Sequence, residues 1–318
     1  MQVGLTAVIV AVTREIPRIL TVSLPSRAEP EPSNDCLPAL PFGPLDPTGD
    51  RTLDLSLRRW VKAQTGLELG YVEQLYTFGD RFRHPQELEG GDRVLTVAYL
   101  ALVREGPSLQ EGDARWLDGY QFFPWEDWRE GQPRVLREFL YPRLEQWIEA
   151  APPEQRELRR ERAHITFGVA GTPWDGYQVL ERYELLYALD LVPEALRDQG
   201  KPAAPARSYP TGQEMAFDHR RILATALGRM RGKLRYRPVI FELLPESFTL
   251  WTLQSTVEAL AGVRLHKQNF RRLVEHGRLV EGTGRLIQTG GRPAELFRFR
   301  REVLTERRAP GVGLPVTR

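Results

Sequence analysis

The sequence predicts an α+β protein that ends in a winged helix-turn-helix domain. The last third reads, in order, as a long basic helix, two shorter helices and a glycine-tipped β-hairpin. Charge agrees, because residues 217–308 hold 19 Lys and Arg against 9 Asp and Glu, whereas residues 1–216 hold 24 against 33. A basic domain joined to an acidic one is typical of a protein in which one part binds nucleic acid, although a merely solvated basic surface gives the same count.

Length and composition set the remaining limits. A chain of 318 residues suggests about two domains. The single cysteine, Cys36, excludes an internal disulfide and fits a reducing, cytoplasmic location. The apolar run at residues 3–12 is too short to span a bilayer and follows no basic residue, so we expect a strand there and no membrane partner.

Hydrophobic periodicity and turn residues predict the elements of the N-terminal part. We expect strands at residues 3–13, 18–22, 67–78 and 93–103. A loop rich in Pro, Asp and Gly covers residues 23–50, and helical spacing follows at 52–65, ending at Gly66.

The middle of the chain is predicted to be helical after an aromatic stretch. Residues 116–128 contain six Trp, Tyr and Phe side chains, which fill a core or an interdomain seam more often than they stack a ligand. Helices are expected at residues 135–150, 151–162 and 177–189, and residues 193–210 are expected to form a linker.

The C-terminal part is predicted to contain helices at residues 217–236, 250–260 and 266–276, then strands at 279–281 and 294–299. The first helix has one apolar face. Its other face is expected to be basic and carries Arg220, Arg221, Arg229, Arg231, Lys233 and Arg235.

The helix at residues 266–276 is the predicted recognition helix. Phe270, Leu273 and Val274 are spaced to face the core. The candidate DNA-binding side chains are Lys267, Gln268, Asn269, Arg271, Arg272 and, at the wing tip, Arg292. Gln and Asn can pair with adenine and Arg with guanine, while a wing arginine suits a minor groove or a phosphate; the alternative is that the arginines form only salt bridges.

The strand–loop–helix pattern near the N-terminus resembles the Nudix fold, an α/β/α sandwich. Nudix hydrolases hold divalent cations with glutamates of an Arg-Glu-x-x-Glu-Glu-x-Gly motif, because hard cations need oxygen ligands. The matching stretch here is residues 59–67, in which Arg59 and Gly66 remain but the three glutamates are Trp60, Ala63 and Gln64. We therefore expect no catalytic residue, no metal site, no cofactor and no hydrolysis.

A degenerate Nudix-like domain followed by a winged helix resembles the Nudix-related regulators of NAD metabolism, the NrtR type. The motifs that carry this resemblance lie at residues 75–80, 97–102, 217–220, 231–236, 241–245, 269–272 and 291–294. The resemblance implies a dimeric bacterial repressor that binds a palindromic operator and senses ADP-ribose, NAD or a related metabolite. The alternatives are a residual Nudix-type pyrophosphohydrolase and a sugar-catabolism regulator of the same architecture.

The resemblance also suggests a division of the chain. We expect a Nudix-like effector domain at residues 1–150, a helical insertion and linker at 151–216, a winged helix at 217–305 and a flexible tail at 306–318. Residues 104–216 replace a much shorter connection in the family, and part of this stretch is expected to supply the last strand and helix of the sandwich.

The effector site is expected beside the motif at residues 75–80. Arg81, Arg83 and Arg93 could meet a pyrophosphate, and Phe78, Tyr99 and the region of Trp125 could stack adenine. Each is equally an ordinary core or surface residue. Asp218 and His219 either relay occupancy to the DNA-binding domain or simply begin the long helix.

Overall fold

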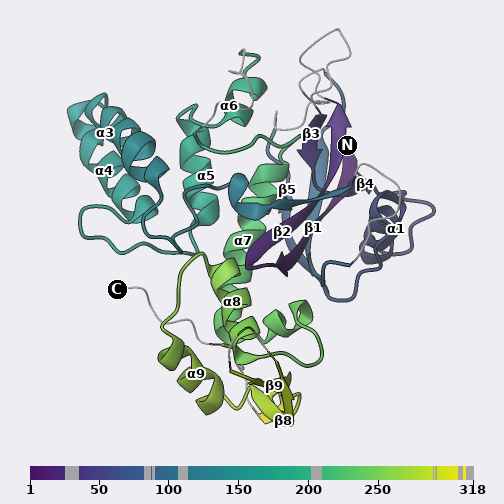
Figure 1. Cartoon of the computed structure of the whole chain (residues 1–318). Coiled ribbons are helices and arrows are strands. Elements are labelled where there is room, and N and C mark those ends of the chain that lie inside the picture. Colours follow the sequence, from purple (N-terminus) through teal and green to yellow (C-terminus); the bar gives the residue numbers. More distant parts are fainter. Residues whose placement is uncertain are drawn as a thin grey trace.

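The computed structural model describes residues 1–25, 36–81, 87, 90–106, 114–201, 210–288, 290, 292–306 and 311–312. Figure 1 shows a sheet with helices on its two sides, a pair of helices set apart from the sheet, and a smaller helical domain with a two-stranded hairpin. None of the helices in the described ranges is long and apolar enough to cross a bilayer.

The N-terminal domain is built on a seven-stranded sheet with the order β3-β2-β1-β6-β5, to which β4 adds on β1 and β7 on β2. Its strands are β1 Gln2–Thr13, β2 Ile16–Pro25, β3 Cys36–Ala39, β4 Phe42–Pro44, β5 Val72–Phe78, β6 Val94–Leu102 and β7 Arg115–Asp118. β1 and β6 run parallel, and the other pairs are antiparallel. The predicted strands are confirmed.

Two short strands were not predicted. β3 and β4 fall within residues 23–50, which we expected to be a loop throughout. Both contain proline, and β3 lies at the sheet edge, where a strand tolerates the missing N–H. Their pairing is decided by β1 and β2 beside them, which a local pattern does not reveal.

Among the described residues, α1 (Leu53–Thr65) covers one face of the sheet and α7 (His219–Tyr236) the other, and α8 (Leu250–Ala261) also contacts β1 and β2. On one face, Leu57 and Val61 of α1 share a core with Leu5 and Ile9 of β1. On the other, the apolar stripe of α7 shares a core with Val8. The α/β/α sandwich is therefore present, and α1 has the predicted ends, with Thr52 as its N-cap and Gly66 at φ 73°.

The helix that completes the sandwich is α7, which the sequence assigned to the winged helix. Residues 104–216 supply the last strand, β7, but not this covering helix. α7 contacts β1, β5 and β6 as well as α8 of the C-terminal domain. This one helix thus packs against both the sheet and the winged helix, because its apolar stripe runs along its whole length.

The middle of the chain forms a helical layer beside the sandwich (Figure 1). Its elements are the 3₁₀ helix η1 Gly119–Gln121, the π-helix η2 Leu136–Leu140, α3 Tyr141–Glu149, α4 Pro153–Phe167, α5 Val179–Ala188 and α6 Pro193–Asp198. The aromatic stretch fills the seam between domains, since Phe122, Phe123 and Trp125 are fully buried. The expected linker begins instead with α6, in which Glu194 and Ala195 are buried.

The C-terminal domain is a winged helix. It consists of η4 Val239–Leu243, α8 Leu250–Ala261, α9 Lys267–His276, β8 Val280–Ile287, β9 Ala294–Phe299 and α10 Val303–Glu306. Thr249 caps α8 and Gly262 ends it at φ 72°. The tail expected to be flexible is anchored at Val312, which is 2% exposed and donates its N–H to the carbonyl of Leu234 at 2.9 Å.

Candidate nucleic-acid interface and ligand cavity

The recognition helix α9 separates its residues by chemistry. Phe270 and Val274 are buried in the core and Leu273 is half-buried. The exposed polar side chains of its first turns are Lys267, Gln268, Asn269, Arg271 and Arg272. The spacing of the three apolar residues therefore fixes the orientation of α9 and presents all five candidates outward.

The wing is a two-stranded sheet of β8 and β9 with an irregularity between Gly282 and Leu286. Arg292 is exposed near the tip, and Gly291 lies outside the described residues. The sequence reasoning missed Leu286 and Ile287, which are 70% and 44% exposed on β8. Exposed aliphatic side chains on a wing can contact a groove wall, and two adjacent aliphatic residues beside the glycine-rich tip were the available signal.

The expected basic face of α7 is present only in part, because Arg229 and Arg235 are exposed but the other four cations are turned to the protein. Arg220 and Arg231 are 0% and 2% exposed, and both form ion pairs with buried glutamates. Arg221 binds Asp80 at 2.6 Å, and Lys233 pairs with Glu73. These cations hold α7 against the sandwich and the helical layer instead of facing DNA.

A cavity of about 230 Å³ lies between the sheet and the first turn of α7. Phe42, Phe78 and Phe217 contribute rings to it, and Asp218 and His219 belong to its wall. The rings of Phe42, Phe217 and His219 contact one another edge to face, with centroids 5.2–5.4 Å apart.

The two aromatic residues expected to stack one adenine point to opposite faces of the sheet. Phe78 belongs to the core beneath α7, whereas Tyr99 belongs to the core beneath α1. Trp125 is fully buried in the seam. Only Phe78 lines the cavity, because alternate residues of a strand face opposite sides and the sequence alone does not assign a strand's two faces.

The expected pyrophosphate arginines lie near the cavity but not in it. Arg81 is exposed just after the lining residue Asp80, and the exposed Arg93 donates to the carbonyl of Gly79. Arg83 lies outside the described residues. The sequence reasoning missed Phe42 and Phe217 as cavity residues. Phe217 begins the motif at residues 217–220, whereas Phe42 had no local signal.

His219 is oriented by the turn between β3 and β4. The backbone N–H of Leu40 donates to Nδ1 of His219 at 3.0 Å, so this nitrogen is an acceptor. Phe217, two residues earlier, has φ 54°, which is a strained conformation for a residue with a side chain. The residues that lead into α7 are thus held in a defined conformation beside the cavity.

The degenerate Nudix positions make structural contacts. The indole N–H of Trp60 donates to the carbonyl of Pro44 at 2.9 Å, and its ring lies against Gly43, where a Cβ would overlap it. The side chain of Gln64 bonds both backbone groups of Phe42, at 2.8 and 3.0 Å. Among the described residues, no group of His, Cys, Asp and Glu could hold a metal ion.

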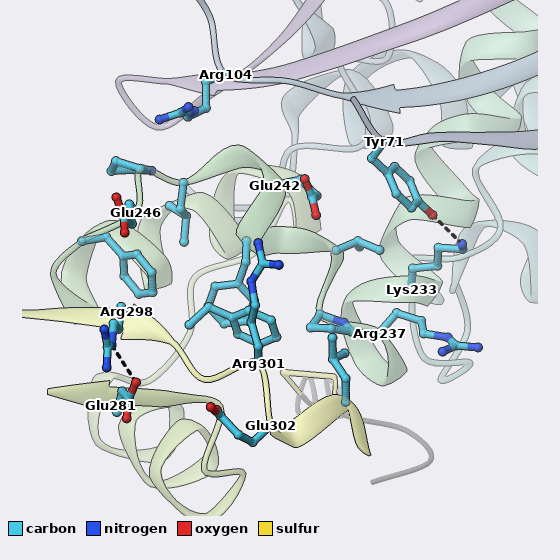
Figure 2. A pocket seen from close by; sticks show the side chains of 18 residues that line it. Tyr71, Arg104, Lys233, Arg237, Glu242, Glu246, Glu281, Arg298, Arg301 and Glu302 are labelled. Carbon is cyan, nitrogen blue, oxygen red and sulfur yellow. Dashed lines mark hydrogen bonds and ion pairs between the residues drawn. The ribbon is translucent and has the colours of Figure 1, made fainter. Parts of the chain in front are cut away.

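A larger groove of about 1080 Å³ separates the sheet from the winged helix (Figure 2). Tyr71 and Arg104 line it from the sandwich side, and Phe241 and Phe299, whose rings stack at 4.2 Å, from the other. The hydroxyl of Tyr71 accepts a hydrogen bond from Lys233 at 3.1 Å. Its walls mix acidic and basic side chains, so its charge selects no ligand class.

The comparison with known families decides the nature of the C-terminal domain. Residues 240–299 match the family described as the NrtR DNA-binding winged helix domain. This part of the chain is therefore similar to the NrtR winged helix. The chain is also 40% identical over 86 residues to the ADPR responsive transcriptional repressor NtrR of Acinetobacter baylyi, a match that covers 27% of this chain and 34% of that relative. The chain thus spans about a third of the curated relative that it matches.

The likeness to solved NrtR structures extends over nearly the whole chain. The structure of Shewanella oneidensis NrtR complexed with a 27mer DNA aligns with a TM-score of 0.55 at 20% identity, covering 95% of both chains. A MutT/nudix family protein of Enterococcus faecalis aligns with a TM-score of 0.52 at 16% identity, covering 94% of this chain and 86% of that one. The predicted fold, an α/β/α sandwich followed by a winged helix, is therefore confirmed.

Proposed function

We propose that the chain is a DNA-binding transcriptional repressor whose affinity for DNA is controlled by ADP-ribose or a related NAD metabolite. The observation that carries this proposal is α9, which presents five polar side chains outward from a domain that matches the NrtR DNA-binding family. The Acinetobacter relative, named for its response to ADPR, supports the choice of effector.

DNA binding would use α9 in the major groove and the wing beside it. Lys267, Gln268, Asn269, Arg271 and Arg272 are the proposed contacts to bases and phosphates, with Arg292 at the wing. A palindromic operator read by a homodimer would place the two helices about 34 Å apart, one turn of DNA. This role places the protein in the bacterial cytoplasm.

The effector would bind in the cavity between the sheet and α7. At about 230 Å³ the cavity is smaller than the usual ligand pocket of about 300–1,000 Å³, so it suits one end of a dinucleotide-sized effector, such as a base or a ribose. The remainder would extend toward Arg81 and Arg93 outside the cavity. Because the first turn of α7 forms part of the wall, a bound effector touches both the sheet and this helix.

We further propose that the sandwich domain is not a hydrolase. Trp60 and Gln64 take the positions of the metal-binding glutamates and are committed to β4 through Pro44 and Phe42. Without oxygen ligands the site has no means to hold the cations that polarise a pyrophosphate. Release of AMP from ADP-ribose with magnesium or manganese would contradict this.

The test is a fluorescence-anisotropy titration of a palindromic DNA from the gene's own neighbourhood, at two salt concentrations. We expect tight, salt-dependent binding that ADP-ribose weakens. Thr96→Phe should fill the cavity and abolish the response while leaving DNA binding intact, and Thr96→Ser is the matched control that keeps both.

Each outcome assigns the function. DNA binding that ADP-ribose, NAD and ADP leave unchanged would overturn the NAD-metabolite effector. A response to pentoses instead would identify a sugar-catabolism regulator of the same architecture. Absence of DNA binding with each operator tested would overturn the repressor itself.

A further inference from the structure

A buried ionic cluster joins the helical layer, α7 and the winged helix. The carboxylate of Glu126 is 0% exposed and binds Arg182 of α5 at 2.6 Å and Arg231 of α7 at 2.5 Å. Both guanidinium groups are also buried. Arg182 donates further to the carbonyls of Thr166 and Asp175, and its guanidinium lies 3.9 Å from the ring centre of Trp174.

The same cluster binds the C-terminal end of α8. The last carbonyls of a helix lack partners within it and carry partial negative charge. Here Arg231 Nε donates to the carbonyl of Leu260 at 3.1 Å, and the hydroxyl of Tyr120 donates to that of Ala259 at 2.7 Å. The N–H of Trp128 donates to the carbonyl of Gly262 at 2.7 Å.

Gly262 allows this close approach. It has φ 72°, a conformation that side chains rarely adopt, and it ends α8. A Cβ on it would overlap the Glu126 carbonyl and crowd the Tyr120 hydroxyl and the Arg231 guanidinium. The end of α8 is therefore fitted to the segment that contains Glu126.

The charges in the cluster favour an ionised glutamate. Burial opposes ionisation of Glu126, but the guanidinium groups of Arg182 and Arg231 outweigh it and hold the pKa of this carboxyl below its ordinary value. One carboxylate thus faces two cations, and the second cation is directed to the negative end of α8. Removing the carboxylate would leave two buried cations repelling each other.

We propose that Glu126 is a positioning residue that locks α7 to the end of α8, so that the cavity wall and the recognition helix move as one body. This inference rests on the proposed function for its consequence. His219 in the cavity wall and Arg231 in the cluster lie on one helix, about 18 Å apart at 1.5 Å per residue. A shift of the first turn of α7 is therefore carried to α8 and on to α9.

The role of the middle segment follows from this arrangement. Residues 119–130 connect β7 to the helices that follow it in the chain. This short segment contains Tyr120, Glu126 and Trp128. This segment therefore acts as a clamp between the domain that contains the cavity and the winged helix. Besides this segment, the winged helix is joined to the sandwich by α7, by contacts of α8 with β1 and β2 and of η4 with β6, and by the ion pair of Arg264 with Glu15.

The first measurement does not depend on DNA or effector. Spin labels on the native, exposed Cys36 and on an introduced Glu275→Cys would report the distance between the sheet and α9 by pulsed electron resonance. We expect one narrow distance distribution for the otherwise unchanged chain and a broadened or shifted one for Glu126→Gln. Glu157→Gln on α4, whose parent side chain is 82% exposed, is the matched control and should stay narrow.

The second measurement tests the functional consequence. Glu126→Gln should bind ADP-ribose with a Kd within about twofold of the parent's. The factor by which ADP-ribose weakens DNA binding should be at least about tenfold smaller in this variant than in the parent. A purely structural role would lower stability and leave the ratio of DNA affinities with and without effector unchanged.

A milder variant covers the case in which Glu126→Gln does not fold. Tyr120→Phe removes the hydroxyl that donates to the carbonyls of Ala259 and Leu260 and accepts from Arg231, but leaves Glu126 in place. It should change the distance and the response in the same direction, by less. The clamp is overturned if Glu126→Gln gives a distance distribution as narrow as the parent's. If Glu126→Gln does not fold, the same result in Tyr120→Phe overturns it. Both tests hold whether or not the chain binds DNA. Failure of the parent to respond to ADP-ribose, with the broadening present, counts against the proposed function alone.

Discussion

Glu214 gives the fold a pH dependence that can be calculated. It precedes the entry of α7, is 7% exposed, and binds Arg197 at 2.9 Å. The same arginine also holds the carbonyls of Met215 and Phe217, at 2.8 and 2.7 Å. Burial, opposed in part by Arg197, raises the pKa of Glu214 from the ordinary 4.5 to about 6.

The sign and size of the effect follow from linkage. Because the folded state binds the proton more tightly than the unfolded chain, the contribution is fully present below pH 4.5 and is lost as the pH rises through about 6. A shift of about 1.5 pKa units corresponds to about 2 kcal/mol. Of this, about 1.2 kcal/mol lies between pH 5 and pH 7.5.

The assay is urea unfolding of the parent chain and of Glu214→Gln at both pH values. Groups distant from this cluster titrate equally in the two proteins, so the difference between them reports Glu214 together with its electrostatic interactions with Arg197, Glu194 and Asp198. We expect the parent to gain about 1.2 kcal/mol relative to the variant on going from pH 7.5 to pH 5. No change, or a change of opposite sign, would show that Glu214 is not held in a desolvated site and would refute the reasoning.

Three further predictions follow from the site. Phe270→Ala should lower the free energy of unfolding by about 3–5 kcal/mol, measured in urea, because the ring of Phe270 is only 2% exposed. Arg271→Ala should weaken DNA binding and reduce the salt slope of log K by about 1, whereas the exposed Arg162→Ala, on α4, should change neither. Gly43→Ala should cost about 1–3 kcal/mol in the same unfolding assay, because its methyl would overlap the ring of Trp60; unchanged stability would contradict that packing.

The residues of the recognition helix were predictable because their pattern is local. Apolar side chains at positions 270, 273 and 274 recur with the helical period, which assigns the remaining positions to the outside. The caps of α1 and α8 were predictable for the same reason, since a threonine before and a glycine after a helix satisfy its own terminal groups.

The cavity was not predictable because its residues are brought together by pairing across the chain. Phe42 reaches it through β4, and Phe217 through a left-handed turn before α7. Phe78 and Tyr99 have equivalent local patterns, yet the register of β5 and β6 places them on opposite faces. That register depends on neighbouring strands and not on either residue's own surroundings.

The sequence by itself determined the two-part architecture, the winged helix and the loss of the metal-binding glutamates, because each rests on local spacing or on residue identity. Only the tertiary structure decided which arginines of α7 are buried. Side-chain type made them a basic surface, but buried carboxylates distant in sequence, Glu126 and Glu194, neutralise Arg231 and Arg220 and take them into the core. A charged side chain can be buried where a residue of opposite charge pairs with it. Because these residues are distant in sequence, only the folded chain brings them together.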